Sequence, residues 1–309
     1  MKRFRLSGVV KPDWTLLRDG EFASLGLATA DPGLPILTFA GAPKYLKQAL
    51  KNPQVSCVLV PPELAESELI RNSEKGFCIA PELRISFFQL HNELAEPPYR
   101  DIYCEEIRPT EIGSDCDISP LADIAKNDVV IGSGVTIEPF VSIKSGTVIG
   151  NGSIIRSGSV LGGSGLEFIR MGERGILPVT HCGKLILGEK VEVQYNCNLS
   201  RSLFPWHATE IGNESKIESL VHIAHGVHTG QRCLIAASVC VAGSAILGDD
   251  VWIGPNATVS SEVKIGNNAR VSLGAVVVGN VADSETVSGN FAIPHERFMQ
   301  EMMKKIMDM

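Results

Sequence analysis

The sequence predicts a mainly β protein: a parallel β-helix of hexapeptide repeats, with a small α/β domain before it and a short helix after it. Three observations lead to this fold class. Aliphatic residues recur every six positions between residues 112 and 281, a period typical of neither an α-helix nor a flat sheet. Residues 1–105 lack this period. Residues 291–309 contain the pattern of a terminal helix that starts near Pro294.

The N-terminal 105 residues alternate between strand and helix signals. Residues 35–40 and 55–62 are predicted strands, because short apolar and β-branched runs dominate them. Residues 42–52 and 83–96 have the apolar spacing of helices. We therefore place a small α/β domain at residues 1–105, and its aperiodic, proline-bearing end connects it to the repeats.

Residues 106–290 hold the hexapeptide repeats. A parallel β-helix buries two positions in each repeat, one aliphatic and one small or β-branched. The longest run of the aliphatic position, broken only by a threonine, is Ile211, Ile217, Ile223, Thr229, Ile235, Val241, Leu247, Ile253, Val259, Ile265, Val271 and Val277. The residue four places after each of these is small or β-branched, so both inward positions are present in every repeat.

Interruptions of the repeat predict where loops leave the coils. The phase shifts by one residue near Asp128 and by more across residues 162–186. The segment 200–210 breaks the ladder just before a histidine-rich stretch. Insertions in a solenoid become loops that usually lie on its binding face. We therefore expect the functional residues near these two segments.

Composition limits the partners and the compartment. The formal net charge is −7, and without a basic stripe a nucleic-acid partner is not expected. No signal-peptide core and no run long enough to span a bilayer is present in the sequence, so we expect a cytoplasmic protein. Cys116, Cys197 and Cys233 fall on inward positions, where we expect reduced core residues rather than ligands.

Residues 221–230, VHIAHGVHTG, gather three histidines at a spacing of three. His222 and His228 occupy equivalent positions of successive hexads, so they should lie on different sides of a coil. His225 occupies another position, and the residue eighteen further on is Gly243. A glycine there would let a substrate approach the backbone closely.

Several motifs together resemble one enzyme family. They are Phe39-x-x-x-Pro43-Lys44-Tyr45, the hexapeptide repeats, the GGSGLEF insertion, the IAH motif that contains His225, and VSGNFAIP near the C-terminus. The chain resembles the UDP-3-O-(3-hydroxyacyl)glucosamine N-acyltransferases of lipid A biosynthesis. This resemblance implies a left-handed β-helix, about three hexapeptides per coil and a homotrimer.

The resemblance also implies a catalytic set. In that family the IAH histidine, here His225, is the general base for the sugar amine, and the N–H of the matching glycine, Gly243, stabilises the thioester oxyanion. Glu218, where the family usually has an acidic residue, would orient or polarise His225. A covalent acyl-enzyme is not needed, because a free amine is already a nucleophile.

The same resemblance implies a substrate-binding set. Phe39 and Tyr45 would stack on the uracil ring, beside Lys44 of the same motif. Phe168 lies in the GSGLEF insertion, which the family uses near its substrate. Glu262 takes the place of a second family histidine and would meet the substrate.

Four departures from the family pattern bear on this interpretation. Ala42 replaces an asparagine that normally precedes the PKY motif. Glu262 cannot act as an imidazole donor. The family's DRG-bearing stretch retains only Arg201, and the tail that engages acyl carrier protein is short.

The predicted function is N-acyl transfer from acyl carrier protein to the amine of UDP-3-O-acylglucosamine in lipid A biosynthesis. No metal or bound cofactor is expected; a phosphopantetheine thioester of acyl carrier protein, or acyl-CoA, is the co-substrate. Lys304 and Lys305 offer a small basic cluster for the acidic carrier.

Three other interpretations remain open. One is an acetyl-CoA-dependent N-acetyltransferase that acts on another nucleotide-linked amino sugar. The second is a trimeric metalloenzyme like the γ-class carbonic anhydrases, with ligands among His207, His222, His225 and His228. The third is a non-catalytic scaffold.

Overall fold

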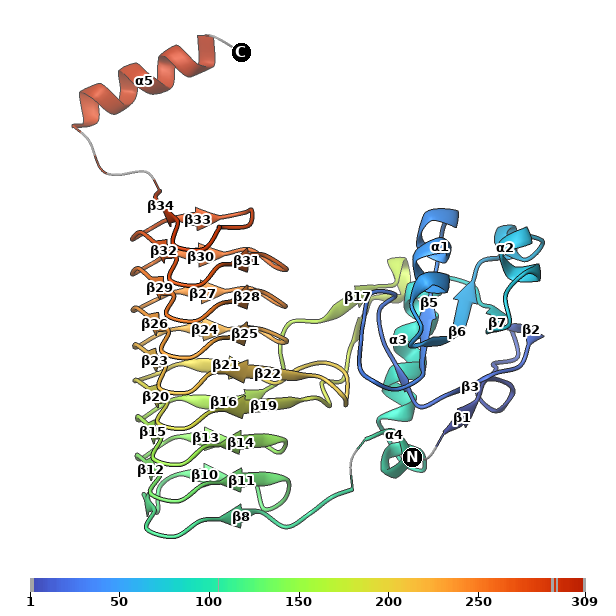
Figure 1. Ribbon diagram of the computed structural model, residues 1–309, viewed down its shortest axis with the longest axis horizontal. Helices are drawn as coiled ribbons and strands as arrows, with labels where there is room; N and C mark the ends of the chain where they lie inside the picture. Colours follow the sequence, from blue (N-terminus) through green and yellow to red (C-terminus); the bar gives the residue numbers. More distant parts are fainter. Residues whose placement is uncertain (1–2, 105, 290–291, 293, 308–309) are drawn as a thin grey trace.

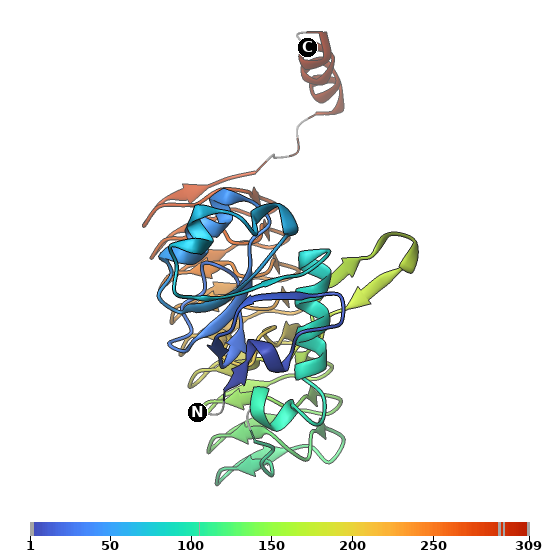
Figure 2. The same ribbon diagram turned by 90° about the vertical axis from the view of Figure 1, so that its right-hand side faces the viewer.

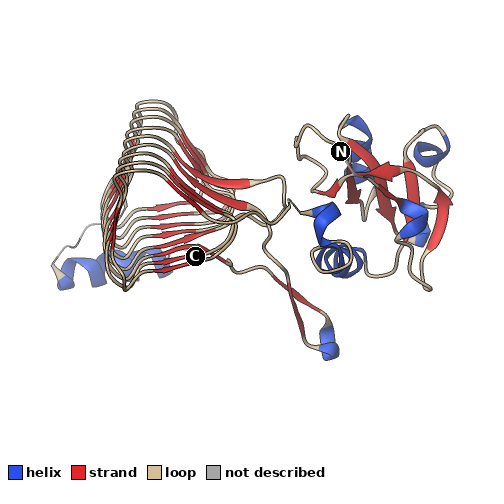
Figure 3. Cartoon of the chain, turned by 90° about the horizontal axis from the view of Figure 1, so that it is seen from below, coloured by secondary structure: helices blue, strands red, loops and turns tan. Residues whose placement is uncertain are grey.

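The computed structural model describes residues 3–104, 106–289, 292 and 294–307. A column of stacked coils and a separate α/β unit lie side by side (Figure 1). A hairpin from the column passes the nearest helix of the α/β unit and projects to one side (Figure 2). Seen along its axis, the column has a triangular cross-section (Figure 3).

The α/β unit is built on a five-stranded sheet in the order β2-β7-β6-β5-β4, in which only β2 runs antiparallel to its neighbour. Its strands are β1 (Phe4–Arg5), β2 (Thr15–Arg18), β3 (Glu21–Phe22), β4 (Ser24–Leu25), β5 (Ile36–Phe39), β6 (Val55–Val60) and β7 (Gly76–Ile79). Its helices are η1 (Leu6–Gly8), α1 (Pro43–Lys51), η2 (Pro62–Leu64), α2 (Glu68–Arg71), α3 (Leu83–Leu94) and α4 (Arg100–Tyr103). The two strands and two helices predicted from the sequence are thus confirmed as β5, β6, α1 and α3.

The column is a left-handed parallel β-helix with three sheets, so the predicted fold class is confirmed. Sheet 1 contains β8 (Glu111–Ile112), β11 (Val129–Ile131), β14 (Thr147–Ile149), β19 (Lys184–Leu187), β22 (Ala208–Ile211), β25 (His228–Thr229), β28 (Ile246–Leu247) and β31 (Lys264–Ile265). Sheet 2 contains β9 (Asp117–Ile118), β12 (Thr136–Ile137), β15 (Ile154–Ile155), β20 (Glu192–Val193), β23 (Lys216–Ile217), β26 (Leu234–Ile235), β29 (Trp252–Ile253), β32 (Arg270–Val271) and β34 (Thr286–Val287). Sheet 3 contains β10 (Asp123–Ile124), β13 (Ser142–Ile143), β16 (Val160–Gly163), β21 (Asn198–Ser200), β24 (His222–Ile223), β27 (Cys240–Val241), β30 (Thr258–Val259) and β33 (Val276–Val277).

The strand register explains each change of phase. Most partners are 18 residues apart, as in Ile223↔Val241, which is three hexapeptides per coil. The pair Ile112↔Ile131 contains one extra residue, the one predicted near Asp128, whose φ is 59°. The pair Leu161↔Leu199 is 38 residues apart, so this coil carries a 20-residue insertion. The pair Leu199↔Ile223 is 24 apart, so the next coil carries six extra residues.

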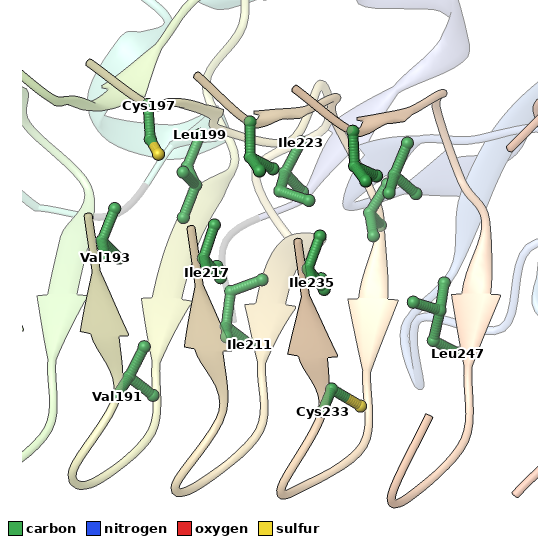
Figure 4. Packing of buried hydrophobic residues seen from close by; sticks show 14 of the residues in the cluster. Val191, Val193, Cys197, Leu199, Ile211, Ile217, Ile223, Cys233, Ile235 and Leu247 are labelled. Carbon is green, nitrogen blue, oxygen red and sulfur yellow. The ribbon is translucent and has the colours of Figure 1, made fainter. Parts of the chain in front are cut away.

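The interior of the β-helix is the predicted double ladder. Figure 4 shows aliphatic side chains of successive coils stacked on one another, with Cys197 and Cys233 among them. These two thiols are buried, whereas Cys116 is only partly buried against the same core. Burial raises the pKa of the Cys197 and Cys233 thiols. Both therefore stay protonated and act as small apolar residues, as expected.

The two excursions fasten the α/β unit to the β-helix. The 20-residue insertion forms a hairpin of β17 (Phe168–Arg170) and β18 (Ile176–Pro178) around η3 (Gly172–Arg174). Its Ile169 and Val179, with Phe204 of the six-residue excursion, belong to the core of the α/β unit. The Trp206 indole N–H also donates to the Leu25 carbonyl at 2.8 Å. The α/β unit therefore has a fixed place beside this part of the β-helix.

The predicted C-terminal helix is α5 (His295–Met307). The expectation that it packs beside the last coil is wrong for a single chain, because its described side chains are exposed. Part of the VSGNFAIP motif and the side chain of Lys305 lie outside the described residues. None of the described helices combines the length and apolar character that a membrane crossing requires.

Candidate active site

Two of the three candidate catalytic residues, His225 and Gly243, lie at one corner of the β-helix, where the chain passes from sheet 3 to sheet 1. His225 lies between β24 and β25 at this corner, and Gly243 lies between β27 and β28 one coil above. The 20-residue and six-residue excursions leave the two coils below His225 at the same corner. Two loops that the sequence marked as functional thus flank the predicted base.

Gly243 lies against the imidazole of His225. A Cβ on Gly243 would lie 3.0 Å from both Cε1 and Nε2 of His225, so any larger residue would push against the ring. The Ser244 N–H donates to the His225 carbonyl at 3.0 Å, and the Gly243 carbonyl accepts from the Glu262 N–H at 3.0 Å. In the described part of the chain, no acceptor takes the Gly243 N–H. The structure therefore offers a free backbone donor beside a histidine.

A second histidine, which the sequence interpretation missed, flanks His225. The rings of His181 and His225 are edge to face with centroids 5.6 Å apart. Gly165 of the insertion lies against both rings, since a Cβ there would lie 3.1 Å from His181 Nε2 and 3.2 Å from His225 Cδ2. The signal that could have found His181 is its place in the predicted functional insertion.

The carboxylate that acts on His225 is Glu167, not Glu218. Glu218 lies at the corner between sheets 2 and 3, where its carboxylate accepts from the Ala237 N–H at 3.0 Å. Within one chain it therefore does not orient His225, which corrects the expectation from the sequence. Glu167 forms an ion pair with Arg84 at 3.0 Å, and its negative charge favours the protonated form of His225.

The surroundings of His225 keep it neutral near pH 7. Burial lowers the pKa of His225 below its usual value of 6.5; the charge of Glu167 opposes this shift, and His222 adds to it. Among the described residues, neither ring nitrogen of His225 has a hydrogen-bond partner. A neutral imidazole with a free lone pair is the form that a general base needs.

A cavity of about 410 Å³ lies next to this corner, between the α/β unit and the β-helix. Its lining includes Asp31 of the α/β unit and Trp206, His207 and His228 of the β-helix. His207 also contacts the site, since a Cβ on Gly226 would lie 2.9 Å from its Cε1. His207 is therefore shared by the cavity lining and the surroundings of Gly226, the residue after His225.

The other histidines are placed as the hexads predict, with one addition. His222 lies on sheet 3 and His228 on sheet 1, so they do not converge. His228 meets His207 instead, with Nε2 atoms 3.3 Å apart, and His207 Nδ1 lies 2.7 Å from Ser202 Oγ. Within the described part of the chain, no three His, Cys, Asp or Glu side chains are grouped as metal ligands.

The predicted uracil-binding pair is not a pair of facing rings. Phe39 is half-buried at the end of β5, 5.0 Å from the ring of Phe87. Tyr45 is exposed on α1, and the Lys44 ammonium lies 4.6 Å from its ring centroid. Ala42 caps α1 without a side-chain hydrogen bond, so the missing asparagine also leaves the helix without a side-chain cap.

Phe168 and Glu262 lie near the site but not in contact with His225. Phe168 begins β17 opposite Pro178, and about half of its surface is exposed. Glu262 is exposed one coil above Gly243, with a φ of 62°. Both side chains are therefore free to meet a ligand at this corner.

Comparisons with known proteins fit the fold and the repeats. The family "Bacterial transferase hexapeptide (six repeats)" matches residues 128–163 and 244–279. Two solved UDP-N-acetylglucosamine acyltransferases share the fold. The one from Bacteroides fragilis has a TM-score of 0.50 at 23% identity and covers 58% of this chain and 66% of its own. The one from Campylobacter jejuni has a TM-score of 0.51 at 22% identity and covers 59% and 68%.

Curated relatives carry the name UDP-3-O-acylglucosamine N-acyltransferase. The protein of a Caulobacter species is 31% identical over 130 residues, which is 42% of this chain and 38% of the relative. The protein of Caulobacter vibrioides is 41% identical over 131 residues, with the same two shares. The match thus spans 38% of the length of these relatives. The repeats of this chain are thus similar in sequence to bacterial transferase hexapeptides and to part of the UDP-3-O-acylglucosamine N-acyltransferases.

Proposed function

We propose that this protein is an N-acyltransferase that moves an acyl group from a thioester to the amine of a nucleotide-linked sugar. The observation that carries the proposal is the juxtaposition of His225 with the unpaired N–H of Gly243. One group accepts a proton and the other donates a hydrogen bond, which are the two needs of acyl transfer to an amine.

The reaction needs three events at this corner. The sugar amine attacks the thioester carbonyl carbon, and His225 takes the proton that the nitrogen loses. The Gly243 N–H donates to the carbonyl oxygen as it becomes negative. The intermediate then collapses and the C–S bond breaks. The departing sulfur takes the proton that His225 accepted from the amine. The products are an amide and a thiol, and no acyl-enzyme is formed.

For the acceptor we propose the cavity beside His207. The α/β unit contributes Asp31 to its lining, so a sugar nucleotide there would touch both parts of the molecule. Tyr45 and Lys44 on α1 are exposed and available to bind the uracil ring of the substrate. Phe168 and Glu262 are available to bind other parts of it. Such acceptors occur in the cytoplasm, where we place the protein.

For the donor and acceptor we propose 3-hydroxyacyl carrier protein and UDP-3-O-acylglucosamine. The names of the curated relatives support this acceptor. We also propose a homotrimer, in which neighbouring β-helices complete the groove for the acyl chain. Lys304 would contribute to the surface that meets the acidic carrier.

A side-by-side transfer assay tests the assignment. The enzyme is given 3-hydroxyacyl carrier protein or acetyl-CoA, with UDP-3-O-acylglucosamine as acceptor, and amide formation is followed by mass spectrometry. We expect faster turnover with the carrier protein. Faster turnover with acetyl-CoA, or none with this acceptor, would favour an N-acetyltransferase for another nucleotide-linked amino sugar. His225→Ala is the background control, because it removes the base without touching the cavity lining.

A further inference from the structure

The buried side chain of His181 has a polar atom without a partner. His181 is 6% exposed, and its Nε2 is one of the few buried side-chain atoms without a hydrogen bond among the described residues. Buried polar groups in native proteins nearly always have a partner, so an unpaired one calls for an explanation. A buried phenylalanine or leucine would fill this space without leaving a nitrogen unpaired.

The protonation state of His181 is set by its surroundings. Its Nδ1 lies 3.1 Å from the Val179 carbonyl, which can only accept, so Nδ1 carries the hydrogen and Nε2 the lone pair. Burial lowers the pKa of His181 to about 4; His225, Arg201 and His91 act in the same direction, and the hydrogen bond to the Val179 carbonyl opposes the shift. His181 is therefore a neutral hydrogen-bond acceptor near pH 7.

The unpaired acceptor and the candidate base lie beside the same point, with their ring centroids 5.6 Å apart. His181 Nε2 and His225 Cδ2 lie 3.1 and 3.2 Å from the same point, the Cβ position of Gly165. A half-turn of the His225 ring exchanges Cδ2 with Nδ1 and Cε1 with Nε2. Cε1 and Nε2 are both 3.0 Å from the Cβ position of Gly243, so the half-turn keeps that contact. It places an N–H donor where Cδ2–H now lies, beside the point that His181 Nε2 also approaches.

We propose that His181 is a positioning residue that accepts a hydrogen bond from Nδ1–H of His225 and so leaves the Nε2 lone pair of His225 facing the substrate beside Gly243. This inference rests on the proposed function, for which it supplies the partner that Glu218 does not provide. His181 touches neither substrate nor reacting atoms. It holds the tautomer of the base, and the hydrogen bond strengthens as His225 takes up its proton.

The primary test reads the tautomer directly and does not depend on activity. Long-range ¹H–¹⁵N spectra of the full-length protein, labelled on histidine, distinguish a ring with hydrogen on Nδ1 from one with hydrogen on Nε2. We expect the Nδ1–H form for His225 in the parent and in His181→Gln, whose amide oxygen can still accept. In His181→Leu we expect a mixture with the Nε2–H form. An Nε2–H tautomer of His225 in the parent protein would overturn the proposal.

Kinetics give a second readout that a merely structural role would not move. His181→Leu should lower kcat about 10- to 100-fold with KM nearly unchanged, and should shift the acidic limb of the kcat profile to lower pH, because an acceptor that stabilises the imidazolium is lost. His181→Gln should recover most of kcat. Equal loss in both variants, with an unshifted profile, would overturn the proposal.

Controls separate this proposal from folding and from the proposed function. His295→Leu, in the exposed α5, should change neither the His225 tautomer nor kcat. Circular dichroism and the melting temperature of His181→Leu show whether the variant is folded. If the parent transfers no acyl group to any amine, the proposed function fails, whereas the tautomer measurement still decides the His181–His225 hydrogen bond.

Discussion

Gly243 and His225 are eighteen residues apart in the chain and in contact in the fold, because one coil of the β-helix is eighteen residues long. The contact is so close that a methyl group on Gly243 would come within 3.0 Å of two ring atoms of His225. The peptide N–H of Gly243 has no acceptor in the described part of the chain. The two groups therefore form a unit whose parts can be removed separately.

Removing the base should abolish most turnover without unfolding the protein. His225→Ala is expected to lower kcat about 10²- to 10⁴-fold, the usual contribution of a positioned general base. The side chain is only half-buried and lacks a hydrogen-bond partner, so the melting temperature should change little. Initial rates at saturating substrate and a thermal melt check both statements. Retained turnover would contradict the assignment, and His295→Ala is the control.

A methyl group on Gly243 should slow the reaction without removing any functional group. Gly243→Ala places Cβ against the His225 ring, which must move away from the oxyanion position. We expect kcat to fall about 10- to 100-fold. This is no more than the fall in kcat when an oxyanion donor is removed, because the Gly243 N–H is kept. Gly279→Ala is the matched control, because a Cβ there meets nothing within 4 Å. Similar rates for the two variants would argue against a role for the Gly243 position.

The pH dependence of kcat/KM should show how burial and the charge of Glu167 together set the pKa of His225. A base works when it is neutral, so kcat/KM should fall as the pH drops through the pKa of His225, which burial has moved below 6.5. Glu167→Gln removes the negative charge that opposes this shift, so the acidic limb should move to still lower pH. Arg84→Gln breaks the same ion pair but keeps that charge. Arg84→Gln should therefore not move the acidic limb to lower pH. A shift to lower pH in both variants would contradict the role of the Glu167 charge.

Sequence periodicity predicted the β-helix and the His225–Gly243 contact because both depend only on the repeat length. It also excluded convergence of His222 and His228, which lie on different sheets. The same reasoning could have excluded Glu218. One hexad forms one side of the coil, and Glu218 precedes His225 by slightly more than one hexad. Glu218 therefore lies near the preceding corner.

Other parts of the site could not be predicted from the repeat. The excursion after Ser200 adds six residues, which is one whole hexad. It therefore leaves the phase of the ladder unchanged, and its length cannot be read from the repeat. The positions of His181 and Glu167 depend on how the 20-residue insertion packs on the α/β unit. That packing joins residues far apart in sequence, such as His91 and Thr180, whose Nε2 and carbonyl oxygen are 2.7 Å apart.

Buried neutral histidines should make the protein acid-sensitive. Burial lowers the pKa of His91, His181 and His207 to about 4 from 6.5. The unfolded chain binds more protons than the folded one in this window, so stability is full above pH 6.5 and is lost as the pH falls toward 4. Each histidine contributes up to about 1.4 kcal/mol per pH unit. Urea melts from pH 7 to 4.5 measure the slope.

A single substitution tests the source of that acid sensitivity. His91 is fully buried, bonded to the Tyr103 hydroxyl and the Thr180 carbonyl, both at 2.7 Å. His91→Gln keeps an amide that can hydrogen-bond but does not titrate. It should be less stable at pH 7 and show a flatter dependence of the unfolding free energy on pH. An unchanged slope would mean that other groups dominate acid unfolding.

Nucleotide binding should depend on Tyr45 in a way that separates it from Phe39. Tyr45 is exposed, so Tyr45→Ala should leave the melting temperature unchanged and weaken binding of UDP about 2- to 13-fold, the equivalent of 0.5–1.5 kcal/mol of ring stacking. Tyr45→Phe keeps the ring and should bind normally. Phe39→Ala removes a ring packed 5.0 Å from Phe87, so it should lower stability as well as affinity. Calorimetric titration with UDP, beside thermal melts, measures both. Normal UDP affinity in Tyr45→Ala would show that the uracil ring does not bind at α1.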